Sequence, residues 1–260
     1  MEADSANEPG INPTHITENL AAVRDRISRA AVRSGRTEAD VELVAVTKTV
    51  GVGEVELLRG LGQTLFGENR VDEVRRKVAG LSQEGVPPRF DLIGTLQTNK
   101  VRQVVGLVNR IHSVDSTRLL EAIHARALSV GVRQDVLLQV NVSGEESKHG
   151  LSPVELQNVL QRAGELGFNA AQAASSHDGN GPFGVQVVGL MTMAPNLPPE
   201  QVRWVFSRLR TIRDEAAGSL PDGVQLAHLS MGMSNDFEVA IEEGATLVRV
   251  GSSLFRAADE

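Results

Sequence analysis

The sequence predicts an α/β protein built as a single (β/α)8 TIM barrel, and two observations lead to this prediction. Short apolar segments alternate with amphipathic segments of helical periodicity along nearly all of the 260 residues. There are eight such apolar segments, and eight strand–helix units close into a barrel at about this chain length. An open, doubly wound sheet is the alternative that the same alternation permits. In both folds, functional side chains gather at the C-terminal ends of the strands.

The predicted strands are runs of β-branched and aliphatic residues. The first is the clearest, because residues 41–46 of VELVAVTKTV are apolar except Glu42, and the run ends near Lys48. Continuous apolar runs of this length are typical of parallel strands that are buried on both faces. In chain order the predicted strands are residues 41–48, 64–68, 90–96, 110–114, 135–142, 185–193, 225–231 and 246–254.

Helical periodicity appears between these strands and once before the first of them. The leading helix is predicted at residues 16–34, where apolar residues recur every three or four positions from Ile16 to Ala31, and Gly35 is a typical C-terminal stop. The other predicted helices are residues 53–61, 69–81, 98–107, 117–130, 153–166, 199–217 and 235–243.

One domain is predicted, with two flexible segments. Residues 1–13 are polar and acidic, so we expect a flexible N-terminus followed by a single barrel domain at residues 14–260. The segment AQAASSHDGNGPFG, residues 171–184, breaks the rhythm and is interpreted as a flexible insertion loop at the N-terminal end of the barrel. His177 and Asp178 in this loop are expected to be solvated, and no metal site is predicted.

Composition excludes several classes of function. The formal charge of -7 opposes sequence-independent binding to nucleic acid. The N-terminus lacks the basic and apolar regions of a signal peptide, and no apolar run approaches the length of a membrane span. Cysteine is absent, which excludes disulfides and cysteine nucleophiles. We therefore expect a cytoplasmic monomer without a membrane or nucleic-acid partner.

The end of the predicted eighth strand, VRVGSS, is suited to bind a phosphate group. Gly251 lets backbone N–H groups approach an anion, and Ser252 adds a hydroxyl donor. The loops after the seventh and eighth strands of such barrels are a recurrent phosphate site. Ser234, in MGMSND, is a further candidate, although capping of the next helix explains this serine equally well.

Lys48 stands at the mouth of the first predicted strand. A surface lysine is the ordinary explanation, but the apolar strand points this side chain inward, where desolvation would lower its pKa and make the amine nucleophilic toward aldehydes. A lysine opposite a phosphate site fits pyridoxal 5′-phosphate, which forms a Schiff base at one end and carries a phosphate at the other. Arg249 is predicted to lie inside the barrel, where it would face the pyridine nitrogen and keep it unprotonated.

Seven segments between Ile16 and Phe255 form a recognisable set. They are AVTKTV, FGENRVDE, LIGTLQTNKVR, IHSVDS, LLQVNVSGEESKHGL, GLMTMAP and SMGMSNDFEVAIEEGATLVRVGSSLF. Together they resemble the YggS family, the pyridoxal phosphate homeostasis proteins, also called proline synthetase co-transcribed homologues. The insertion at residues 171–184, and Arg256 in place of the usual glycine, depart from the pattern of that family.

The resemblance implies a barrel similar to the N-terminal domain of bacterial alanine racemase, with pyridoxal phosphate bound to Lys48 as an aldimine. It implies that Asn69 lies beside the cofactor and that Arg249 faces the pyridine nitrogen. It also implies that the phosphate is bound by Ser234, Gly251 and Ser252. Such proteins are implied to buffer the cofactor or deliver it to apo-enzymes, with no established catalytic turnover, so no catalytic residue is assigned.

Two enzyme hypotheses remain beside the carrier hypothesis. A weak racemase-like enzyme would need a second base, but the chain contains no tyrosine, and its end at Glu260 leads us to expect no added domain. His112 and His228 could move protons, although both lie in apolar strands and are interpreted as satisfied core residues. An aldolase acting on a phosphorylated sugar through Lys48 lacks an obvious neighbouring carboxylate. The carrier hypothesis is therefore preferred.

Overall fold

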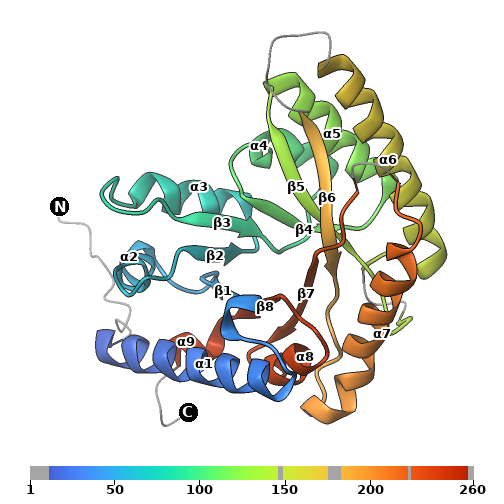
Figure 1. Ribbon diagram of the computed structural model, residues 1–260. Helices are drawn as coiled ribbons and strands as arrows, with labels where there is room; N and C mark the ends of the chain where they lie inside the picture. Colours follow the sequence, from blue (N-terminus) through green and yellow to red (C-terminus); the bar gives the residue numbers. More distant parts are fainter. Residues whose placement is uncertain (1–11, 146–148, 175–182, 222–223, 257–260) are drawn as a thin grey trace.

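The computed structural model is a closed barrel of eight parallel strands surrounded by helices (Figure 1). It describes residues 12–145, 149–174, 183–221 and 224–256. The strands are β1 (Glu42–Val46), β2 (Leu65–Glu68), β3 (Arg89–Leu92), β4 (Arg110–Val114), β5 (Arg133–Gln139), β6 (Gly184–Met191), β7 (His228–Met233) and β8 (Leu247–Val250).

Barrel closure decides between the two folds that the sequence permits. Each strand pairs in parallel with the next one in the chain, and β8 pairs with β1 from Glu42 opposite Leu247 to Ala45 opposite Val250. An open sheet would leave two unpaired edges, whereas here the strand order is a ring. The predicted (β/α)8 barrel is therefore confirmed.

The helices form the outer layer of the barrel. They are α1 (Pro13–Arg33), α2 (Val52–Gly60), α3 (Val71–Gly80), α4 (Val101–Val104), α5 (Thr117–Val130), α6 (Pro153–Ala174), α7 (Pro199–Ala217), α8 (Phe237–Glu242) and α9 (Ser252–Phe255). Short 3-10 turns precede β1 at Glu38–Asp40 and α4 at Thr98–Lys100. The main apolar core lies between this layer and the strands.

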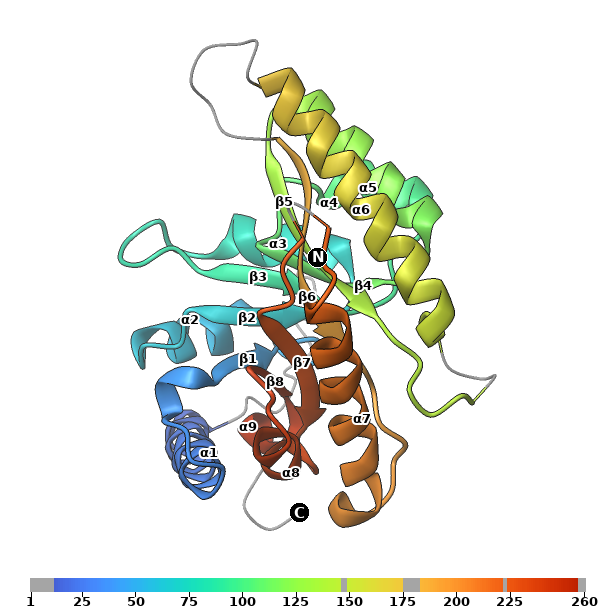
Figure 2. The ribbon, with the colours of Figure 1, turned by 45° about the vertical axis from the view of Figure 1, so that its right-hand side comes forward.

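The additional N-terminal helix lies along α8 and α9, as both views show (Figures 1 and 2). Ion pairs join Arg26 to Glu238 at 2.8 Å and Arg33 to Glu242 at 2.7 Å. The helix begins one turn earlier than predicted, because the Asn12 side chain accepts a hydrogen bond from Thr14 N–H and Pro13 occupies the first turn, where its missing N–H costs nothing. Gly35 follows its C-terminal end with a φ of 71°, as predicted for a stop.

Besides shifts of a few residues at the ends of other elements, three differences from the prediction stand out. The helix expected at residues 98–107 is a 3-10 turn followed by the short α4. Helix α6 continues to Ala174, since residues 167–174 are rich in good helix formers such as alanine and glutamine. The first part of the predicted loop at 171–184 is thus helical, Gly184 starts β6, and residues 175–182 lie outside the described part of the chain, as do residues 1–11.

The third difference affects the site. The strand predicted at residues 246–254 ends at Val250, and α9 starts at Ser252. A helix of four residues is too short to show a periodic pattern, so the predicted strand was extended to Leu254, whereas Leu254 and Phe255 end the helix. Both side chains pack into the outer core rather than continuing the barrel wall.

No helix in the described ranges is both long and apolar enough to cross a membrane.

Candidate functional site

A cavity of about 470 Å³ opens at the C-terminal ends of the strands. Its lining includes every residue that the sequence or the resemblance assigned to cofactor binding: Lys48, Asn69, Ser234, Arg249, Gly251 and Ser252. These residues come from the ends of β1, β2, β7 and β8, so the closed barrel brings together positions that are far apart in the chain.

Lys48 lies in the turn that follows β1. Lys48 lines the cavity together with Val46, the last residue of that strand. The predicted inward direction is therefore supported by the place of Lys48 in the cavity lining. The predicted desolvation of its amine is wrong, because β1 ends before this residue and Lys48 is exposed.

A buried cluster lies directly behind Lys48. The Lys77 ammonium, on α3, donates to the Thr47 carbonyl and to Glu68 Oε1, and the Thr47 hydroxyl donates to the same carboxylate oxygen at 2.6 Å. All three side chains are fully buried. Since Thr47 precedes Lys48 and Glu68 precedes Asn69, this ion pair ties together the two turns that carry these cavity residues.

Arg249 is 5% exposed and lines the inner end of the cavity. Its guanidinium donates to the Ser230 hydroxyl and, at 2.9 Å, to the Thr192 carbonyl. Burial lowers its pKa to about 10, while the nearby charge of Asp236 acts in the opposite direction. Arg249 therefore stays charged at neutral pH, and its hydrogen-bond acceptors among the described residues are both neutral oxygens.

Ser234 connects β7 to the start of α9. Its hydroxyl oxygen accepts from the Gly251 N–H at 3.2 Å and from the Ser253 N–H at 3.5 Å. The cap position of α8 is Asp236, whose carboxylate accepts from Met233 N–H at 2.6 Å. Asp236 rather than Ser234 therefore caps α8, so helix capping, the alternative explanation for Ser234, is wrong. The Gly251 N–H is bonded to the Ser234 hydroxyl and so acts on the cavity through that side chain.

Two glycines shape the chain here. Gly232 has a φ of 89°, and a Cβ at this position would lie 2.6 Å from Ala240 Cβ. Gly232 lies at the register shift between Ser230 and Met233. Its left-handed backbone conformation turns the chain toward the cavity. At Gly251 a Cβ would lie 3.2 Å from the Val46 carbonyl oxygen, so the close approach of β8 to β1 favours glycine.

Sequence reasoning missed several residues of the lining. Asp236 is buried at the cavity wall, and burial raises its carboxyl pKa despite the N–H bond from Met233. Three partly exposed apolar side chains, Met193, Leu197 and Met233, lie at the rim. The motifs MTMAP and MGMSND at strand ends marked these segments, but nothing in the sequence assigned their side chains to the cavity.

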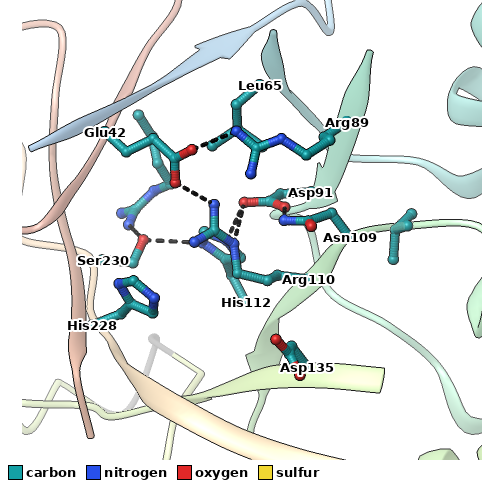
Figure 3. Close-up of polar contacts among 12 residues, drawn as sticks. Glu42, Leu65, Arg89, Asp91, Asn109, Arg110, His112, Asp135, His228 and Ser230 are labelled. Atoms are coloured by element: carbon teal, nitrogen blue, oxygen red, sulfur yellow. Dashed lines mark hydrogen bonds and ion pairs between the residues drawn. The ribbon is translucent and has the colours of Figure 1, made fainter. Parts of the chain in front are cut away.

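Polar side chains also fill the barrel below the cavity (Figure 3). His112, on β4, is fully buried, with Nε2 2.9 Å from Asp91 and Nδ1 3.0 Å from the Ser230 hydroxyl. The predicted satisfied core residue is therefore confirmed for His112, whereas His228 is only partly buried. No group of three or more possible metal ligands occurs in the described ranges.

Comparison with known proteins identifies the family. The family model described as alanine racemase, N-terminal domain, matches residues 18–259. A pyridoxal phosphate homeostasis protein from Aquifex aeolicus (strain VF5) is 42% identical over 239 residues, covering 92% of this chain and 96% of the relative. The chain belongs to the pyridoxal phosphate homeostasis protein family. The predicted resemblance is thus confirmed.

Several solved structures share the barrel. PipY of Synechococcus elongatus PCC7942, solved with pyridoxal phosphate bound, superposes with a TM-score of 0.77 at 33% identity, covering 93% of this chain and all of PipY. A protein of unknown function from Bifidobacterium adolescentis has a TM-score of 0.80 at 36% identity, with 98% of each chain covered. Alanine racemase from Clostridium difficile shares the fold, with a TM-score of 0.68 at 15% identity over 96% of this chain and 58% of the racemase.

Proposed function

We propose that this protein binds pyridoxal 5′-phosphate in the cavity at the C-terminal end of its barrel and serves in the homeostasis of that cofactor. Family membership supports the proposal, as does the cofactor bound in the related PipY structure. The observation that carries it for this chain is the meeting of Lys48, Arg249 and Ser234 around one cavity.

The residues of the cavity fit the chemical groups of this cofactor. A volume of about 470 Å³ lies within the usual range of small-molecule sites. Pyridoxal phosphate supplies an aldehyde that reacts with amines, and an electron-withdrawing ring. Lys48 offers the amine, and its exposure leaves that amine accessible from the cavity mouth. Arg249 is charged and hydrogen-bonds only to neutral oxygens among the described residues, so its remaining donors suit an acceptor such as an unprotonated ring nitrogen.

We assign the phosphate to the side of the cavity formed by the ends of β7 and β8. Because the Ser234 oxygen accepts from two backbone N–H groups, its own hydrogen is free to be donated into the cavity. Ser252 adds a second hydroxyl on the same side, and Gly251 contributes by orienting Ser234. Asn69 is assigned to the wall beside the ring.

We further propose a carrier role that buffers the cofactor or delivers it to apo-enzymes, without turnover of amino acids. Removal of a proton from one face of a substrate and its return to the other requires two bases, and these 260 residues contain no tyrosine to act as the second one. An arginine at the ring nitrogen keeps that nitrogen unprotonated, so the ring stabilises a carbanion less well.

Retention of the cofactor tests this proposal. Purified protein is mixed with pyridoxal phosphate, freed of excess cofactor by gel filtration, and examined by absorbance and phosphate analysis. We expect one cofactor per chain, and recovery of activity when the loaded protein is added to an apo-enzyme that depends on pyridoxal phosphate. Protein that retains no cofactor would overturn the binding proposal, and a loaded protein that never restores an apo-enzyme would overturn delivery.

A further inference from the structure

A chain of hydrogen bonds runs along the barrel interior from Arg249 to the opposite end, and Figure 3 labels its members from Ser230 to Glu42. It passes through Ser230 on β7, His112 on β4 and Asp91 on β3. From Asp91 it continues to Arg110 at 3.0 Å, and Arg110 then bonds to Glu42 at 2.8 Å. Arg249 is the only member of this chain that lines the cavity, so binding of a cofactor there does not by itself explain the buried groups behind Arg249.

The direction of each bond follows from the charged groups on either side of Ser230 and His112. A guanidinium can only donate, so the Ser230 oxygen accepts from Arg249. The Asp91 carboxylate can only accept, so the His112 Nε2 that faces it carries a proton. In the neutral imidazole Nδ1 then carries none, and it accepts the hydroxyl hydrogen of Ser230. The geometry selects one neutral tautomer of His112.

The charges around this histidine support the neutral form. Burial lowers the pKa of His112, against the attraction of the Asp91 carboxylate. Asp91 also accepts from Asn109 at 2.9 Å and from Arg110, so its negative charge is shared with a permanent cation at the lower end of the barrel. A protonated His112 would place a second buried cation beside Ser230, the acceptor for Arg249, and would reverse the Ser230 bond.

We propose that His112 is a positioning residue for Arg249 and acts through Ser230. Its neutral Nδ1 accepts a hydrogen bond from the Ser230 hydroxyl. This bond orients a lone pair of the hydroxyl oxygen toward the Arg249 guanidinium. Together with the Thr192 carbonyl, this fixes two of the guanidinium nitrogens and aims the remaining donors into the cavity. Arg249, Ser230 and His112 are all buried, and both hydrogen-bond acceptors of Arg249 are neutral, so its remaining donors are available to a bound molecule.

This inference rests on the proposed binding of pyridoxal phosphate, since the ring of the cofactor is the group that Arg249 would face. The two proposals fail in different ways. Wild-type protein without bound cofactor would contradict the proposed function. If the wild-type protein binds the cofactor and variants of Ser230 and His112 bind it identically, only the positioning role is contradicted.

The test compares Ser230→Ala, His112→Phe and the double variant, each loaded with pyridoxal phosphate. The readouts are the absorbance maximum of the bound cofactor, the midpoint of its pH titration and its retention. We expect both single variants to shift the maximum and the midpoint in the same direction and to weaken retention by about tenfold, the effect of one lost hydrogen bond to a charged group. The double variant should show no further shift, because both substitutions interrupt one path.

His228→Phe is the matched control, because His228 lies on the same strand as Ser230 but outside the chain of bonds to Arg249 (Figure 3). It should lower stability without moving the absorbance maximum. Folded Ser230→Ala protein with a wild-type maximum and midpoint would overturn the proposal. A second measurement needs no variant: nitrogen-15 NMR of the wild-type protein should show His112 as the neutral Nε2–H tautomer between about pH 6 and 8. The Nδ1–H tautomer, or an imidazolium, would equally overturn it.

Discussion

At the scale of single residues, the Ser234 hydroxyl is the contact that joins the ends of β7 and β8. It accepts from the Gly251 amide and leaves its hydrogen for a ligand. We expect the double variant Ser234→Ala and Ser252→Ala to weaken retention of pyridoxal phosphate by about a hundredfold or more, because charge-assisted hydrogen bonds are worth roughly 1.5–3 kcal/mol each. Equilibrium dialysis measures this loss.

Ser253→Ala is the control for that experiment. Its hydroxyl donates to the Ser234 carbonyl at 3.4 Å, and its side chain is outside the cavity lining. Retention by this variant should stay within a few-fold of wild type. If the double variant also keeps wild-type retention, the phosphate binds elsewhere.

Because His112 is buried, the free energy of unfolding should depend on pH. The pKa of its imidazole is lowered in the folded protein, so between that lowered value and about 6.5 the unfolded chain binds more protons than the folded one. The stability from this residue is therefore fully present above about pH 6.5 and is lost as the pH falls below it. Urea unfolding from pH 7.5 to 5 should show a falling free energy of unfolding, with a shallower fall in His112→Phe. Equal slopes would contradict a buried neutral histidine.

The gathering of the six candidate residues at one cavity could be predicted, because it depends on which strand ends meet in a barrel. The acceptors of Arg249 could not be predicted. Ser230 and the Thr192 carbonyl reach it from β7 and from the end of β6, and such contacts between distant segments depend on the register of the closed barrel. The exposure of Lys48 also escaped prediction, since it depends on where β1 ends.

At the scale of secondary-structure elements, the buried pair Lys77–Glu68 fastens α3 to the ends of β1 and β2. Replacing Lys77 with methionine would leave the Glu68 carboxylate buried without its cation. We expect a loss of about 3–5 kcal/mol in the free energy of unfolding. Urea unfolding measures it, and a Lys77→Met, Glu68→Met double variant should recover part of the loss because two apolar side chains replace two charges.

Lys100→Met provides a comparison, because Lys100 is a half-buried lysine in the 3-10 turn before α4 and has no ion pair among the described residues. Its effect should be within about 0.5 kcal/mol of wild type. A Lys77→Met variant as stable as Lys100→Met would show that the buried pair contributes little.

Elements with strong patterns were predicted best. The bounds of β4, α5 and α7 match the prediction because each has clear start and stop signals, such as the Ser116 cap and the left-handed Gly131 that flank α5. Helix α4 was predicted too long and α9 was not predicted, since four residues do not complete enough turns to show a helical period. The apparent end of α6 was placed too early because its last residues carry little apolar contrast.

At the scale of the whole molecule, the barrel places the Lys48 amine, the Arg249 guanidinium and the hydroxyls of Ser234 and Ser252 around one cavity. Under the proposed carrier role, these groups exchange an amine at the aldehyde of the cofactor and carry out no two-base chemistry. We expect racemisation, decarboxylation and transamination of an amino-acid panel to stay near background for the loaded protein. A turnover number within the usual enzyme range of about 1–1,000 per second, abolished by Lys48→Ala, would favour an enzyme over a carrier.

The most direct test of the account is to find which lysine bonds to the cofactor. The sequence contains four lysines, Lys48, Lys77, Lys100 and Lys148, so the assignment by peptide mass spectrometry is unambiguous. The protein is loaded with pyridoxal phosphate, reduced with borohydride and digested. We predict a single modified peptide that carries the cofactor on Lys48, and no covalent adduct in Lys48→Ala. An adduct on any other lysine, with Lys48 unmodified, would contradict the central claim.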